Sequence, residues 1–225
     1  MSFETFQSNP AQPYLSKRYT LAEEIFSSIT HGIGALLSVA ALVILVAYAS
    51  IHGDAWRIVS FSIYGFTLFF LYLSSTLYHS IFHEKTKRVL RIFDHSSIFL
   101  LIAGSYTPIT LVSMRGVWGW ILFSMVWLIA IIGIILKSIS LDKMKRISIF
   151  LYIFMGWLII IALKPMLTMI PPGLFTWLLM GGIIYTLGVI FYAWKKIPFN
   201  HGIWHLFVLG GSTTHFLGIL FYLAM

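Results

Sequence analysis

The sequence predicts an all-α, polytopic membrane protein that folds as a bundle of seven transmembrane helices. Of its 225 residues, 59% are hydrophobic and only 10% are charged, and the mean hydropathy is +0.92. These values are not those of a water-soluble globular domain. The apolar runs reach the roughly 20 residues that a helix needs to cross the hydrocarbon core. They are too long for barrel strands, and a helix satisfies its own backbone hydrogen bonds where water is excluded.

Seven apolar runs follow one another with short connectors between them. They extend from Glu24 to Ala49, Trp56 to Phe82, Ile92 to Met114, Val117 to Leu136, Ile147 to Leu163, Gly173 to Trp194 and His201 to Ala224. The chain therefore divides into a cytoplasmic N-terminal segment, residues 1–23, and a membrane domain, residues 24–225. The N-terminal segment is polar and contains Pro, unlike a cleavable signal peptide, so we expect the first run to be retained.

Several runs carry features of their own. Pro108 predicts a kink in the third run, because Pro lacks a backbone N–H and clashes with the preceding turn. A six-span alternative, in which the fifth run lies along the membrane interface, is disfavoured because it would spoil the charge asymmetry of the connectors. In the sixth and seventh runs, the pairs Gly181-Gly182 and Gly210-Gly211 predict close packing between helices.

Lys and Arg residues predict the orientation in the membrane. Twelve of them fall on the side of the N-terminus: Lys17, Arg18, Lys85, Lys87, Arg88, Arg91, Lys137, Lys143, Lys145, Arg146, Lys195 and Lys196. On the other side are Arg57, Arg115 and Lys164. Because positive charge stays cytoplasmic, the N-terminus is predicted inside and the C-terminus outside, in the cell membrane.

Charge and cysteine content exclude other classes. The net charge is +8 and the sequence pI is about 9.7, yet the basic residues lie in short connectors and form no continuous stripe. A nucleic-acid-binding protein is therefore excluded. Because the chain has no cysteine, it has neither disulfides nor thiolate metal ligands. His nitrogen and carboxylate or water oxygen remain as ligands for any metal.

Polar side chains gather at one depth, near the cytoplasmic ends of four runs. Ionisable groups inside membrane spans are costly and mark functional sites. The residues are Glu24, Ser27, Ser28 and His31 in the first run, Ser75 and His79 in the second, Asp94 and His95 in the third, and His201 and His205 in the seventh. Spacings of three, four and seven place the residues of the first run on one helical face.

This layer predicts a metal site. His201 and His205 are one helical turn apart, and His79 is the best-placed third ligand. Three histidines with one open position are the catalytic form of zinc coordination. Asp94 is then predicted to accept a proton, and Ser75 to hydrogen-bond water, Asp94 or a substrate carbonyl. The alternative is that these are interfacial histidines without a metal.

The remaining polar residues receive supporting roles. Glu24 and His31 are predicted to bind each other, because a buried charge without a partner is costly. The alternative is a structural zipper of polar contacts along the first run. His95 lies about 100° around the helix from Asp94 and is expected to face another helix or the surface. His215 lies about 15 Å deeper than His205 by helical rise, so it is predicted to be a buried polar partner of Thr213, Thr214 or the first run.

Four stretches of the sequence resemble a known family. These are EEIFSSITHGIG (23–34), STLYHS (75–80), FDHSSIFLLIAGSYTP (93–108) and HGIWHLFVLGGSTTHF (201–216). They are similar to the bacterial hemolysin III proteins, which belong to the wider progestin and adipoQ receptor (PAQR) family. The resemblance covers essentially all the spans.

The resemblance implies a seven-helix bundle with a cytoplasmic N-terminus and a zinc ion near the cytoplasmic leaflet. By motif position, the family's zinc ligands fall on His79, His201 and His205, and its Ser and Asp near the metal-bound water fall on Ser75 and Asp94. One departure is Ser27, where bacterial relatives usually carry Asn.

The leading functional hypothesis is a zinc-dependent membrane hydrolase that cleaves amide or ester bonds of membrane lipids. Ceramidase-like activity is what the resemblance to the adiponectin receptors implies, with a role in lipid homeostasis. A second hypothesis is a non-catalytic regulator or sensor of membrane lipid and energy state with a structural zinc. A third is a pore-forming cytolysin, which has low weight because a chain that is hydrophobic throughout has no soluble form to secrete.

Overall fold

The computed structural model of the protein describes residues 19–225, and within them all regular structure is helical, without a strand. The helices are α1 (Leu21–His52), α2 (Ala55–Ser80), α3 (Glu84–Pro108), α4 (Val117–Ile139), α5 (Lys145–Gly156), α6 (Leu163–Met169), α7 (Pro172–Ala193) and α8 (Asn200–Ile219). Seven helical segments of this range are long and apolar enough to cross a membrane, with α5 and α6 together forming the fifth. The all-α, seven-span prediction is confirmed, and the six-span alternative is wrong. Residues 1–18 of the predicted N-terminal segment lie outside the described range.

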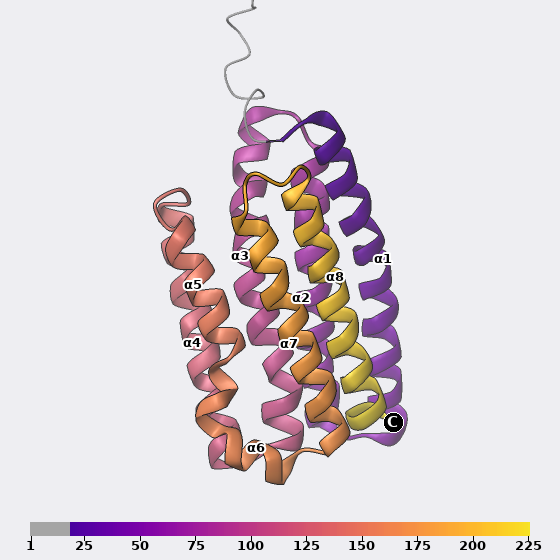
Figure 1. Cartoon of the computed structure of the whole chain (residues 1–225). Helices are drawn as coiled ribbons and strands as arrows, with labels where there is room; N and C mark the ends of the chain where they lie inside the picture. Colours follow the sequence, from indigo (N-terminus) through magenta and orange to yellow (C-terminus); the bar gives the residue numbers. More distant parts are fainter. Residues whose placement is uncertain (1–18) are drawn as a thin grey trace, which may run out of the picture.

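The helices form one bundle (Figure 1). α1 packs against α2 and α8, α2 against α3, α3 against α4, and α7 against α8. α5 contacts α3, α4 and α7. α1 and the pair α4 and α5 therefore stand at opposite edges of the bundle. This arrangement brings α1, α2, α3 and α8 together, the helices that carry the polar layer.

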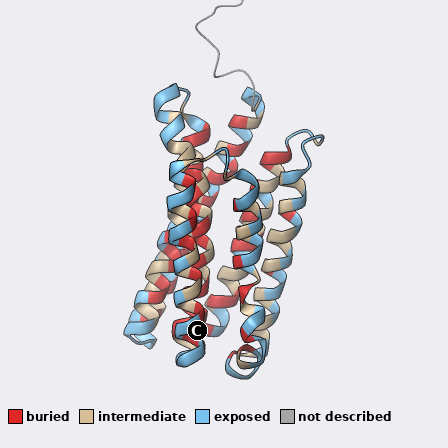
Figure 2. Ribbon diagram, turned by 90° about the vertical axis from the view of Figure 1, so that its left-hand side faces the viewer, coloured by how far each residue is buried: buried red, intermediate tan, exposed pale blue. Residues whose placement is uncertain are grey.

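Burial distinguishes an inner face from an outer one on each helix (Figure 2). Leu45, Phe61 and Phe99 are fully buried, whereas Leu36 and Ile139 are 75% and 77% exposed. Apolar side chains on the outer surface suit contact with lipid, because lipid tails are as apolar as the protein core. Small residues permit the closest helix contacts. A Cβ at Gly181 would lie 2.2 Å from His215, which confirms close packing of α7 on α8 at this position.

The bounds of the helices differ from those of the predicted apolar runs, and the residues at the helix ends explain why. α1 begins at Leu21, before the predicted Glu24, because Thr20 and Glu23 form a reciprocal capping box. α3 begins at Glu84, eight residues before the predicted Ile92, so the basic connector is itself helical. At Pro108, where a kink was predicted, α3 gives way to a π-helical turn, Ile109–Ser113. Local changes of this kind are typical where Pro removes a backbone donor.

Candidate metal centre

The polar layer forms at one end of the bundle, because α1, α3 and α8 begin there and α2 ends there. Glu24 lies in the first turn of α1, and His79 lies in the last turn of α2. His201 and His205 occupy the first two turns of α8. The chain that enters α8 is held by Asn200, whose side-chain amide donates to the carbonyls of Phe191 and Tyr192 at 3.3 and 3.1 Å. The start of α8 is thereby tied to the end of α7.

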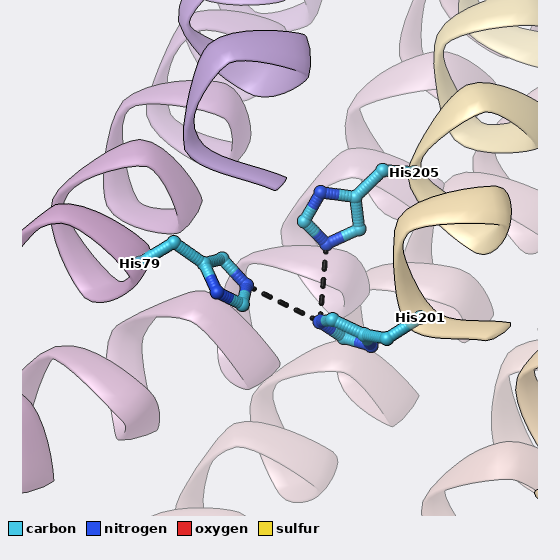
Figure 3. Close-up of side chains that lie close together, drawn as sticks. All are labelled: His79, His201 and His205. Atoms are coloured by element: carbon cyan, nitrogen blue, oxygen red, sulfur yellow. Dashed lines mark hydrogen bonds between the residues drawn. The ribbon is translucent and has the colours of Figure 1, made fainter. Parts of the chain in front are cut away.

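Three buried histidine side chains converge here (Figure 3). The Nε2 atom of His201 lies 3.2 Å from Nε2 of His79 and 3.1 Å from Nε2 of His205. Ligand atoms of the three residues all lie within 4.8 Å of one another. The structure thus brings together the residues that the sequence predicts as metal ligands.

Hydrogen bonding alone does not account for this convergence. An imidazole nitrogen carries either one hydrogen or one in-plane lone pair. His201 Nε2 can therefore form a hydrogen bond with Nε2 of His79 or with Nε2 of His205, but not with both. A single cation between the three nitrogens accepts all three lone pairs. Zn–N bonds of about 2.0–2.1 Å in a tetrahedron would place the nitrogens about 3.3–3.4 Å apart, close to the two distances from His201 Nε2. The residues present therefore fit a metal of the zinc type.

Contacts of the opposite ring nitrogens orient two of these side chains. His79 Nδ1 lies 2.6 Å from Glu24 Oε2, and the other carboxylate oxygen lies 2.9 Å from Lys87 Nζ. A carboxylate paired with a lysine accepts hydrogen bonds, so Nδ1 of His79 carries the hydrogen and Nε2 is free to bind a metal. His205 Nδ1 likewise faces the carbonyl of Ser27 at 3.4 Å. Because the contact uses the backbone of Ser27, the departure of this side chain from the family pattern leaves it intact.

These contacts lead to a prediction for Glu24→Gln. The amide keeps the size of the side chain but loses the charge that balances Lys87 and fixes His79. Metal affinity is expected to fall about 10–100-fold, as is typical when an outer partner of a ligating histidine is lost. Competition with a chelator, followed by metal analysis, measures this change. Glu23→Gln is the matched control, since Gln also completes a capping box, and equal affinity in both variants would contradict the assigned role.

The predicted pair between Glu24 and His31 is wrong. The carboxylate of Glu24 points to α2 and α3 instead, where His79 and Lys87 bind it. The His31 ring stacks on the His205 ring, with centroids 3.6 Å apart and planes at 8°. The Tyr19 ring stacks on the His201 ring, with centroids 4.6 Å apart. These two rings therefore support the ligands by packing. The zipper alternative is borne out in part, since Ser28 Oγ also bonds Ser80 Oγ at 2.6 Å.

Asp94 and Ser75 both lie buried at the same end of the bundle. Oδ2 of Asp94 lies 3.0 Å from Nδ1 of His95. The His95 ring also faces another helix, as expected, since it lies edge-on to the Tyr78 ring of α2 with centroids 6.2 Å apart. Ser75 Oγ has no hydrogen-bond partner within residues 19–225, and it makes no bond to Asp94. A buried hydroxyl in this state is available to a bound molecule.

A small cavity of about 40 Å³ adjoins the histidines and is lined by Asp94, His201 and His205, among other residues. It shares Leu71, Ile98 and Trp204 with a second cavity, which in turn shares residues with a third deeper in the bundle. The walls of these cavities come mainly from α3, α5, α7 and α8, and Leu71 of α2 and Lys137 of α4 also line the cavity at the histidines. The series runs from His201 to His215, about 21 Å along α8 by helical rise. The series of cavities is therefore longer than the roughly 15 Å depth of one leaflet, and an acyl chain reaches about as far as that depth.

His215 lies in the deeper two cavities, well away from the three converging histidines. Its Nε2 atom donates to the carbonyl of Leu178 on α7 at 3.1 Å. It is a polar partner between helices, as predicted, but its partner is a backbone carbonyl of α7 and not Thr213, Thr214 or the first span. No signal in the sequence identifies such a carbonyl.

Comparison with known proteins identifies the family. The family described as "Haemolysin-III related" matches residues 19–216, nearly the whole described chain. The chain belongs to the hemolysin III family. It is 52% identical to "Hemolysin-3 homolog" of Bacillus subtilis (strain 168) over 204 residues, 91% of this chain and 96% of the relative. It is also 52% identical to "Hemolysin-3" of Bacillus cereus over 200 residues, 89% of this chain and 91% of the relative.

A more distant relative places the hemolysin III family within the PAQR superfamily. The chain is 30% identical to the human "Monocyte to macrophage differentiation factor" over 227 residues, 98% of this chain and 93% of that protein. The shared length extends over every membrane span. This hemolysin III family member is therefore a multi-pass membrane protein.

Sequence analysis of this hemolysin III family member missed two residues of the site. Lys87 was counted as an orientation signal, but it lies over the Tyr78 ring and bonds Glu24. Tyr19 falls in the polar segment before the first run, where nothing indicates that it reaches His201. Both contacts depend on which helices are neighbours.

Proposed function

We propose that this protein is a zinc-dependent hydrolase of amide or ester bonds in membrane lipids, with ceramidase-like chemistry. The observation that carries the proposal is the convergence of three histidine Nε2 atoms beside Asp94, at the polar end of an apolar series of cavities. A polar reactive end joined to an apolar compartment suits a substrate with a carbonyl head and a long acyl chain. Membrane lipids are such molecules.

The chain's own residues have distinct tasks in this proposal. His79, His201 and His205 would hold the zinc, which supplies Lewis-acid polarisation of a carbonyl and activation of water. Asp94 accepts a proton at its carboxylate and returns it to the leaving group. Ser75 donates a hydrogen bond to the substrate carbonyl. The cavity walls bind the acyl chain and exclude bulk water from the reacting end.

We also propose where the site lies in the cell. The end of the bundle that carries the histidines also carries Lys85 in the first turn of α3 and Lys143 and Lys196 in connectors, whereas the opposite end carries few basic residues. By the positive-inside rule, the site then faces the cytoplasmic leaflet of the cell membrane. Substrate would enter sideways from that leaflet, between α5 and α7.

Metal analysis combined with a hydrolysis assay tests the proposal. Detergent-purified protein is expected to carry about one zinc per chain and to release fatty acid from a fluorescent ceramide or from an ester analogue. A variant with His79, His201 and His205 all changed to alanine is expected to do neither. Zinc without turnover on either substrate would contradict the hydrolase and favour a regulator with structural zinc. Absence of zinc from wild-type protein purified without chelator would contradict the metal site itself.

A further inference from the structure

We propose that the cavity beside the histidines contains a second, cationic subsite, formed by Lys137, Lys145 and Ser148, which binds the anionic group of a lipid. The anionic group is an oxyanion, either the phosphate of a head group or the carboxylate of a fatty acid. The proposal rests on the proposed function and narrows its substrate class to negatively charged lipids. It assigns the three residues a role separate from metal binding.

Lys137 is the first observation. It lies near the end of α4 and is only 2% exposed, although a buried charge inside a membrane span is costly. Its ammonium group has three N–H donors. Within residues 19–225, its one hydrogen-bond acceptor is the hydroxyl of Ser148, at 3.0 Å, and no carboxylate lies within ion-pair distance. The group is therefore buried, with donors left for a ligand.

The surroundings of Lys137 are the second observation. Lys137, Lys145 and Ser148 line the same cavity as His201 and Asp94. Lys145 is exposed, so one lysine lies inside the cavity and the other lies at its rim. Lys145 also opens α5, whose N-terminus has no side-chain cap. The positive end of this 12-residue helix adds to the attraction for an anion.

The charges around the cavity favour one kind of ligand. Asp94 is the acidic residue of the wall, and its carboxylate is engaged by His95. Asp142, nearby, is engaged by Arg91. Two lysines and a hydroxyl then remain at one part of the cavity and the metal ligands at another. A lipid that placed its ester or amide carbonyl at the histidines would bring a neighbouring phosphate to the lysines, whereas a fatty acid would place its single carboxylate there.

Binding of matched lipid pairs tests the subsite. Oleoyl lysophosphatidate is compared with monoolein, and oleate with oleyl alcohol, so that each pair differs in its anionic group. Binding is followed by tryptophan fluorescence, since Trp204 lines the cavity, and by the shift in thermal midpoint. The wild type is expected to bind the anionic member of at least one pair about 10–100-fold more tightly, as hydrogen bonds to charged groups typically contribute. The pair that shows the larger preference identifies phosphate or carboxylate.

Variants connect the preference to these residues. Lys137→Met, which has a similar length and no charge, is expected to lose the preference while keeping its zinc. Lys137→Arg is expected to keep most of it. Ser148→Ala is expected to weaken it several-fold, and provides a second variant if Lys137→Met folds poorly. Lys143→Met removes an exposed lysine from the same side and is the matched control. Equal binding within both lipid pairs, or a preference that survives Lys137→Met, would overturn the subsite.

The two proposals fail in different ways. Wild-type protein that prefers the anionic lipids through Lys137 but hydrolyses nothing would retain the subsite and refute the hydrolase. Hydrolysis that is equally fast for anionic and neutral esters, with no preference in binding, would retain the hydrolase and refute the subsite.

Discussion

Changing His201 to alanine is expected to remove the metal almost completely. His201 Nε2 is the atom that both other ligands approach, at 3.2 and 3.1 Å, so its loss leaves two nitrogens that no longer surround a cation. Zinc content is expected to fall from about one to below roughly one tenth per chain. If free zinc stands at 100 times the dissociation constant, the variant also loses about 3 kcal/mol of unfolding free energy.

Metal analysis and thermal unfolding, with and without added zinc, measure both effects. The wild-type midpoint should rise with zinc, and the midpoint of the His201→Ala variant should not. His52→Ala is the matched control, because His52 is an exposed histidine at the other end of α1. A full metal complement in the His201→Ala variant would show that the ligand assignment is wrong.

Changing Asp94 to asparagine is expected to lower kcat/KM for lipid hydrolysis about 10²–10⁴-fold, the range typical of a lost general acid or base. The amide has the same shape but accepts no proton. Because Asp94 lines the cavity without being one of the three converging residues, zinc content is expected to remain near the wild-type value. The combination of retained metal and lost turnover separates proton transfer from metal binding.

Steady-state hydrolysis by zinc-loaded protein measures this effect. Asp54→Asn is the control, since Asp54 caps α2 at the far end of the bundle and Asn is an equally good cap. Turnover of the Asp94→Asn variant within a few-fold of wild type would assign the proton transfer to another group.

Much of the site could be predicted from the sequence because helical periodicity is local information. The spacing of His201 and His205 places both rings on one face of any helix, and the depth of His79 follows from the end of its apolar run. These predictions required no knowledge of which helices are neighbours. The same is true of the seven spans, whose lengths follow from the thickness of the bilayer.

The rest of the site depends on helix packing. Glu24 was predicted to pair along its own helix with His31, but α1 presents the carboxylate to α2 and α3. Lys137 was indistinguishable from the other basic residues at span ends until α5 was placed beside it. In both cases the residue type indicated a buried polar contact, whereas the partner was determined by a helix distant in the sequence.

The separation of the ligands along the chain has a consequence for biosynthesis. His79 and His201 are 122 residues apart, so α8, which carries His201 and His205, leaves the ribosome well after α2. A nascent chain that has inserted only the first six spans therefore contains His79 but neither His201 nor His205, and cannot form the three-histidine site. Binding of one ion by all three histidines would have to follow insertion of α8, so the ion would join parts of the bundle that are made early and late.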